Sequence, residues 1–153
     1  MTLQLTIDLL NQIYAHADDG YPEEVCGLIL GPRGTPDEIR RCHNRQNALH
    51  AEDPLAFPRD ARTAYNLGAE DLFFLDASLR SDRPTQVIYH SHIDVGAYFS
   101  KEDELAAAAG ELLYPVDYLV IDARPEGARG ARLFHFHDGR FIELATYHRG
   151  NRR

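Results

Sequence analysis

Three short runs of strand-forming residues most constrain how this chain can fold. They are VCGLIL at residues 25–30, QVIYHSH at residues 86–92 and DYLVI at residues 117–121. The first and third are almost wholly apolar, which is typical of strands covered on both faces of a sheet. Since segments with helical periodicity lie between them, the sequence predicts an α/β fold of the α+β-like kind, in which helices flank a mixed central β-sheet.

The remaining elements are predicted from periodicity and from residues that begin or end helices and turns. Strands are expected at residues 3–5 and 38–42, and helices at residues 7–20 behind a Thr6 N-cap, about 59–79, and 100–113. The polar stretch 44–58 contains two prolines and is expected to be irregular. The pair Asp138-Gly139 predicts the two-residue turn of a C-terminal hairpin.

Length and composition disfavour several classes of function. The 153 residues amount to about one ordinary domain, so we expect a single domain over residues 1–153. The net charge of −8, from 24 acidic and 16 basic residues, disfavours nucleic acid or an anionic membrane surface as the main partner. No apolar run approaches the roughly 20 residues that span a bilayer. Two cysteines outside a C-x-x-C motif and an N-terminus without a basic start predict a cytoplasmic protein.

The chemistry of the chain is concentrated between residues 90 and 103. On a strand, His90 and His92 point to the same face, because side chains alternate with a period of two. If Ser100 caps the following helix, Asp103 lies in the first helical turn and can reach back over the strand end. Two imidazoles and one carboxylate are the three protein ligands of a catalytic zinc site, which leaves a fourth position for water.

Each half of this pattern also has an ordinary structural explanation. Ser100-x-x-Asp103 resembles a capping box, with Asp in place of the usual Glu or Gln, and it would stabilise a helix without any metal. Two histidines on a strand are by themselves common. It is the combination, in a strand–loop–helix context, that favours a metal site over these explanations.

The pattern His90-x-His92-x7-Ser100-x2-Asp103 is similar to the signature of the JAMM (MPN-plus) zinc metallopeptidase family. That family also carries a glutamate on a strand near the N-terminus, and the segment PEEVCGLILG at residues 22–31 resembles this part of the pattern, with Glu24 in the glutamate position. The resemblance extends over most of the chain and corresponds to small, single-domain prokaryotic members. It implies the MPN/cytidine-deaminase-like architecture.

The resemblance also implies a role for each of these residues. His90, His92 and Asp103 would bind one Zn²⁺ ion per chain. Glu24 would accept a proton from the zinc-bound water and deliver it to the leaving amine. Ser100 would help to hold the oxyanion of the tetrahedral intermediate, because a hydroxyl donor beside the metal stabilises charge that develops in the transition state.

The implied activity is hydrolysis of a peptide or isopeptide bond next to the Gly-Gly tail of a ubiquitin-like or sulfur-carrier protein. Small prokaryotic members resemble enzymes that remove a C-terminal cysteine or a short extension from such carriers. Ile93 and Phe99 stand where many members have proline, which puts the shape of the cleft in doubt. Two alternatives stay open: a non-catalytic MPN-type interaction module, and a metallohydrolase of small amides. An exposed sheet edge near the hairpin would permit a homodimer.

Other candidate residues have plainer explanations. Asp94 would lie on the histidine face if the strand continues, and it is an alternative ligand, although an exposed loop acid is the simpler interpretation. His135 and His137 form a second H-x-H pair that is expected to face solvent. Cys26 lies within an apolar strand and is expected to be a small core residue rather than a nucleophile.

Overall fold

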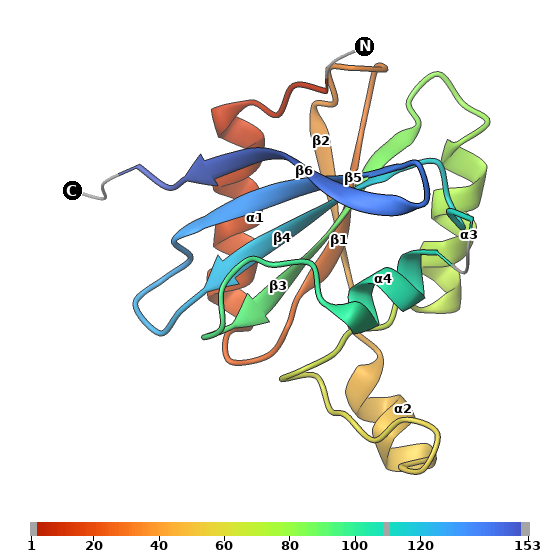
Figure 1. Ribbon diagram of the computed structural model, residues 1–153, viewed down its shortest axis with the longest axis vertical. Helices are drawn as coiled ribbons and strands as arrows, with labels where there is room; N and C mark the ends of the chain where they lie inside the picture. Colours follow the sequence, from red (N-terminus) through yellow and green to blue (C-terminus); the bar gives the residue numbers. More distant parts are fainter. Residues whose placement is uncertain (1–2, 109–110, 151–153) are drawn as a thin grey trace.

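The computed structural model describes residues 3–108 and 111–150, and its centre is a six-stranded sheet (Figure 1). The strand order is β2-β1-β3-β4-β5-β6. Strands β3 and β4 pair in parallel, and the other neighbours pair antiparallel, so the expected mixed central sheet is confirmed. The strands are β1 (Cys26–Leu30), β2 (Glu38–Cys42), β3 (Thr85–Ile93), β4 (Asp117–Ala123), β5 (Gly130–His137) and β6 (Arg140–His148).

Helices cover both faces of this sheet. They are α1 (Ile7–Gly20), α2 (Gln46–Glu52), α3 (Ala69–Ser78) and α4 (Lys101–Ala107). Helix α1 packs its apolar side on one face, where Ile13 joins Ile29 and Leu119 in a buried core. The opposite face is covered by α3 and α4, through Leu75 and Ala107. Helix α2 projects away from the sheet at the bottom of Figure 1.

Side chains alternate between the two faces of β3, and this decides which of its residues can form a site together. Val87 and Tyr89 lie in the core beneath α1, whereas Ile88 lies in the core beneath α3 and α4. His90 and His92 have the same parity as Ile88, so both rings are on the α3–α4 side. Residues 87–92 of β3 are all buried, and they include both histidines.

Several predicted elements are confirmed. Thr6 caps α1, since its hydroxyl accepts a hydrogen bond of 3.2 Å from the N–H of Leu9. Asp138 and Gly139 have φ values of 49° and 79° and connect β5 to β6, as the hairpin prediction required. Residues 38–42 form β2, an edge strand.

Three predicted elements are wrong. Residues 3–5 form no strand, and their connection to the fold includes a single backbone bond from Gln4 N–H to the carbonyl of Gly34. The helix expected at about 59–79 is confined to α3, at residues 69–78, while the stretch 44–58, expected to be irregular, contains α2. The helix expected over 100–113 ends at Ala107, because Ala108 is extended; residues 109–110 of that prediction lie outside the described part of the chain.

Side chains from the preceding segment explain why residues 59–68 are not helical. The Asn44 amide donates to the carbonyl of Ala64, and the Gln46 amide donates to the carbonyl of Arg59. The Asn66 N–H donates to the side-chain oxygen of Asn44. These backbone groups are therefore unavailable for helical hydrogen bonds. None of the described helices is long and apolar enough to cross a membrane.

Candidate metal centre and active site

Three buried side chains converge at the end of β3. The Nε2 atom of His90 lies 3.1 Å from Oδ1 of Asp103, and Nε2 of His92 lies 3.1 Å from Oδ2 of the same carboxylate. The two Nε2 atoms are 3.2 Å apart. The exposed fractions of His90, His92 and Asp103 are 0%, 5% and 9%. Their ligand-type atoms therefore form a compact, shielded triangle that can hold a metal ion.

The dimensions of the triangle fit zinc. A tetrahedral zinc ion with bonds of about 2.0–2.2 Å has ligand atoms about 3.3–3.6 Å apart. The observed separations are 3.1–3.2 Å, and those to Asp103 join each ring to a different carboxylate oxygen, so a small shift of the side chains would seat an ion. Two imidazole lone pairs and an acidic oxygen repel one another when buried together, and a cation removes that repulsion.

A second hydrogen bond prepares His92 for metal binding. Its Nδ1 atom lies 3.1 Å from the carbonyl oxygen of Gly96, which accepts a proton and donates none. Nδ1 is therefore the protonated nitrogen of the neutral ring, and Nε2 presents its lone pair to the triangle. His90 has no such partner, since its buried Nδ1 makes no hydrogen bond, but the ring of Tyr65 stacks on it with centroids 4.4 Å apart.

Charge in the triangle is held on Asp103. Burial opposes ionisation of this carboxyl, but His90, His92 and the N–H of Ser100 together bring its pKa well below the usual range. Burial also lowers the pKa of His90, against the opposing effect of Asp103. An anionic carboxylate with a neutral imidazole is the protonation state that binds a divalent metal.

Ser100 and Asp103 also form the capping box that the sequence suggested. The Asp103 N–H donates to the Ser100 hydroxyl at 3.1 Å, and the Ser100 N–H donates to Oδ2 of Asp103 at 3.0 Å. The structural explanation and the metal-site explanation are therefore compatible, because the cap fixes the carboxylate that faces both histidines. Since the Ser100 hydroxyl accepts the capping bond, its own hydrogen is free to be donated.

Glu24 precedes β1 and lies in the same pocket. Its N–H donates to the carbonyl of Ala61 at 2.7 Å, and its carbonyl accepts a bond of 2.9 Å from the Asn44 amide. The next residue, Val25, exchanges hydrogen bonds with Ser91, which stands between the two histidines. Glu24 is thus fixed from both the central strand and the loop before α3, with only 7% of its surface exposed.

The environment of Glu24 favours its protonated form. Burial raises the pKa of the carboxyl to about 9, the Asp103 charge adds to this effect, and Arg59 opposes it. A cation held by the nearby triangle would act in the same direction as Arg59 and lower this pKa. A carboxyl whose protonation responds to its surroundings in this way is suited to transfer a proton.

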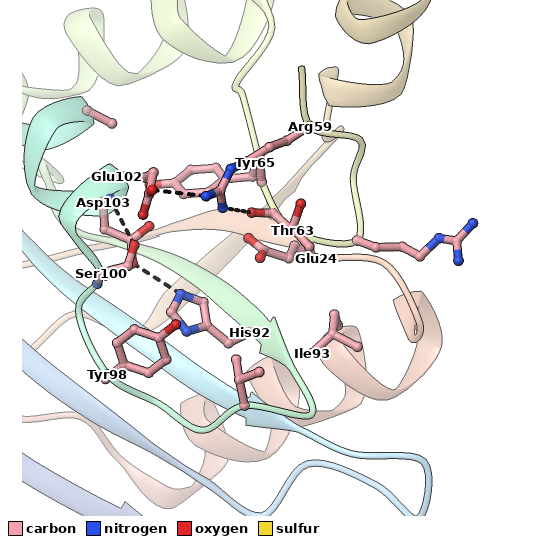
Figure 2. Close-up of a pocket in the computed structure, with 14 residues that line it drawn as sticks. Glu24, Arg59, Thr63, Tyr65, His92, Ile93, Tyr98, Ser100, Glu102 and Asp103 are labelled. Carbon is pink, nitrogen blue, oxygen red and sulfur yellow. Dashed lines mark hydrogen bonds and ion pairs between the residues drawn. The ribbon is translucent and has the colours of Figure 1, made fainter. Parts of the chain in front are cut away.

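The pocket has a volume of about 230 Å³ (Figure 2). Four of the five predicted site residues line it, and the fifth, His90, is fully buried. The wall includes residues that the sequence analysis did not select. Tyr98 packs edge-on against His92 with centroids 4.8 Å apart. Arg59, Arg62 and Thr63 of the loop before α3 and Glu102 of α4 also line the pocket.

Ile93 and Phe99, which stand where many family members have proline, have different surroundings. Ile93 lines the pocket directly. Phe99 instead packs on Tyr118, Phe134 and Phe141, with centroids 4.5–5.4 Å apart. Phe99 therefore anchors the loop before α4 to the sheet through aromatic contacts.

The other candidates lie outside this cluster. Asp94 follows β3 with a φ of 61° and accepts a hydrogen bond of 2.7 Å from the Tyr21 hydroxyl, as a loop acid. His137 is exposed, whereas His135 is half-buried and pairs with Asp117 of β4 at 2.6 Å, a partner that sequence spacing did not indicate. Cys26 is a fully buried free thiol in the core.

Comparison with known proteins shows which family the chain belongs to. The model that describes prokaryotic homologues of the JAB domain matches residues 6–133. The chain belongs to this family. The match spans Glu24 and all the residues of the triangle, and it confirms the resemblance to small prokaryotic JAMM-type proteins.

Individual relatives of this JAB-domain protein carry a more specific name. The CysO-cysteine peptidase of Mycobacterium tuberculosis strain H37Rv is 28% identical over 142 residues, which cover 92% of this chain and 87% of the relative. The protein of the same name from Mycobacterium bovis has the same identity and coverage.

Solved structures agree on the fold of this JAB-domain protein. A solution structure from Desulfitobacterium hafniense matches with a TM-score of 0.68 at 21% identity, covering 94% of this chain and 90% of the other. A second, from Salinibacter ruber, matches with a TM-score of 0.61 at 25% identity, covering 95% and 89%.

Proposed function

We propose that this protein is a zinc-dependent peptidase that removes a C-terminal extension from a ubiquitin-like or sulfur-carrier protein ending in Gly-Gly. The observation that carries the proposal is the convergence of His90, His92 and Asp103 in a buried triangle beside Glu24 and Ser100. Family membership and the name of the mycobacterial relatives support the peptidase class and the carrier.

His90, His92 and Asp103 are the proposed metal ligands. When bound, a zinc ion supplies a Lewis acid and lowers the pKa of a coordinated water to about 7. The capping box keeps Asp103 facing both rings, and the Gly96 carbonyl keeps the His92 Nε2 lone pair directed toward the ion. These contacts orient the ligands before the ion arrives, which lowers the cost of binding it.

Glu24 is the proposed general base and general acid. Its carboxylate takes a proton from the attacking water as the water oxygen bonds to the scissile carbonyl carbon, and it returns that proton to the leaving nitrogen as the C–N bond breaks. Ser100 is the proposed oxyanion donor, because its hydroxyl hydrogen is not engaged by the capping bond.

Replacing Glu24 by Gln tests this proposal. The substrate is a ubiquitin-fold carrier that ends in Gly-Gly followed by one cysteine, and mass spectrometry follows the loss of that cysteine. We expect Glu24→Gln to retain zinc and to lose at least about 100-fold in turnover, since a positioned proton-transfer group contributes this much or more.

The neighbouring residue provides a matched control. Glu23 carries the same side chain but points to solvent and accepts a bond from Asn47 outside the pocket. Glu23→Gln is expected to keep wild-type turnover. Undiminished turnover in Glu24→Gln would overturn the role of Glu24. A zinc-loaded wild type that cleaves no carrier would favour the interaction module, and cleavage of small amides alone would favour the small-amide hydrolase.

A further inference from the structure

The pocket beside the histidines is lined by both acidic and basic side chains. Glu24, Glu102 and Asp103 line the pocket, and the basic residues among its described lining are Arg59 and Arg62. Arg59 comes from the loop before α3 and reaches toward α4, where its Nη2 atom lies 3.0 Å from Oε1 of Glu102 (Figure 2). Its Nη1 donates to the Thr63 carbonyl at 3.3 Å, which fixes the guanidinium at the pocket edge.

The ion pair between Arg59 and Glu102 is a weak one. The side chains are 47% and 57% exposed, and pairs in such contact with water add little to stability. A guanidinium has five N–H donors, of which these contacts use two. An incoming carboxylate can therefore replace Glu102, or bind beside it, at little cost to the fold.

Arg59 lines the same pocket as Glu24, the proposed proton donor to the leaving group. It is close enough to Glu24 to lower the pKa of that carboxyl. In the proposed reaction Glu24 protonates the leaving nitrogen. When the leaving group is a C-terminal amino acid, its α-carboxylate is two covalent bonds from that nitrogen. A lysine side chain released from an isopeptide has no carboxylate at this distance.

We propose that Arg59 is a specificity-determining residue that binds the free α-carboxylate of the released residue. This inference rests on the proposed peptidase function and narrows it: the substrate is a carrier extended at its C-terminus, and a carrier joined to a lysine side chain is a poor substrate. Glu102 occupies the same donors in the free protein and is an internal competitor for Arg59. An arginine suits this role because its planar fork matches a carboxylate.

Binding of paired peptides tests the inference without turnover. In a zinc-loaded Glu24→Gln background, calorimetry compares two carrier-tail peptides that end in Gly-Gly-Ala, one with a free carboxylate and one with a terminal amide. Alanine avoids a thiol that could bind zinc. We expect the acid to bind about tenfold more tightly than the amide, as for a partly exposed charge-assisted hydrogen bond.

Four variants in that background separate the causes of such a preference. Arg59→Gln should abolish it, Arg59→Lys should restore part of it, and Glu102→Gln should increase it. Arg80→Gln is the control, because Arg80 forms an exposed ion pair with Asp76 away from the pocket and should leave the preference unchanged. Equal binding of acid and amide, or a preference that survives Arg59→Gln, would overturn the inference; the second result would mean that the peptide carboxylate binds another cation of the pocket, either Arg62 or the metal.

A turnover assay distinguishes failure of this inference from failure of the proposed function. The wild-type enzyme is given the carrier with a C-terminal cysteine and the same carrier joined to a lysine side chain. Cleavage of the first alone, with a higher KM in Arg59→Gln than in the wild type, supports the inference. Equal cleavage of both refutes the role of Arg59 but leaves the peptidase function standing. Cleavage of neither refutes the peptidase function, and the inference falls with it.

Discussion

The side-chain amide of Asn44 donates a 2.9 Å hydrogen bond to the backbone carbonyl of Glu24. The same amide donates to the carbonyl of Ala64, while its oxygen accepts from the N–H groups of Gln46 and Asn66. One half-buried side chain thus joins Glu24, two residues before β1, to the loop that lines the pocket, although the two segments are distant in sequence.

Replacing Asn44 by Asp should lower stability strongly. The substitution removes both amide donors and places a carboxylate oxygen beside two carbonyl oxygens. We expect a loss of about 2–4 kcal/mol in the free energy of unfolding, measured by urea denaturation, because a hydrogen-bonded network is broken and its acceptors are left unpaired. The same substitution at the exposed Asn11 of α1 is the control, with an expected change within about 0.5 kcal/mol. Equal effects at both positions would contradict the assigned role of Asn44.

Two substitutions at Ser100 separate its capping role from its proposed catalytic role. Ser100→Ala should cost about 1 kcal/mol of stability through loss of the cap, whereas Ser100→Gly should cost only a few tenths. Both lack the hydroxyl, so both should lower kcat by about 100-fold if Ser100 holds the oxyanion. Stability, zinc content and kcat are measured together. Wild-type kcat in the stable, zinc-loaded Ser100→Gly protein would show that the hydroxyl has no catalytic role.

Gly27 is needed for close packing between β1 and β3. It is paired in register with Tyr89, and an added Cβ would overlap the ring of that tyrosine. Since Tyr89 is fully buried beneath α1, the ring has no free space to enter. Gly27→Ala should therefore destabilise the protein by about 1–3 kcal/mol, as overpacking does. A thermal melting temperature equal to that of the wild type would contradict this packing.

His16 should make stability depend on pH. Burial, with a smaller contribution from Arg41, lowers the pKa of this histidine to about 4, and Asp19 opposes the shift. As the pH falls below about 6.5, the unfolded chain binds a proton that the folded ring does not, so the folded state loses relative stability down to about pH 4.

The His16→Gln variant isolates this contribution. Gln can keep a hydrogen bond to the Tyr89 hydroxyl, which now lies 2.6 Å from the His16 ring, but it does not titrate. Between pH 7 and pH 4.5 the wild type should lose on the order of 1–2 kcal/mol more than the variant, after allowance for water near the ring. Parallel stability profiles in urea would contradict the lowered pKa.

The convergence of His90, His92 and Asp103 could be predicted from sequence because its geometry is local. A two-residue spacing on a strand and a three-residue spacing at a helix N-cap fix the directions of His90, His92 and Asp103. Glu24 lies far from them in sequence, and only the family resemblance indicated its place. The structure brings it to the same pocket through its hydrogen bonds with Ala61 and Asn44.

The loop around the pocket could not be predicted in this way. Periodicity favoured a long helix from about residue 59, but the side chains of Asn44 and Gln46 bind the backbone there and hold it in an irregular path. Arg59 was not selected for the same reason: its importance follows from the direction of that path, which places it opposite Glu102. Such contacts between distant segments leave no periodic signal in the sequence.

The central claim is that His90, His92 and Asp103 bind one catalytic zinc ion, and metal content tests it most directly. Zinc per chain is measured in the wild type and in His92→Ala after reconstitution and dialysis, with the exposed His137→Ala as the control. We predict about one zinc per chain in the wild type and the control, and none in His92→Ala. A wild type that stays empty, or a His92→Ala protein that keeps its zinc, would contradict the account.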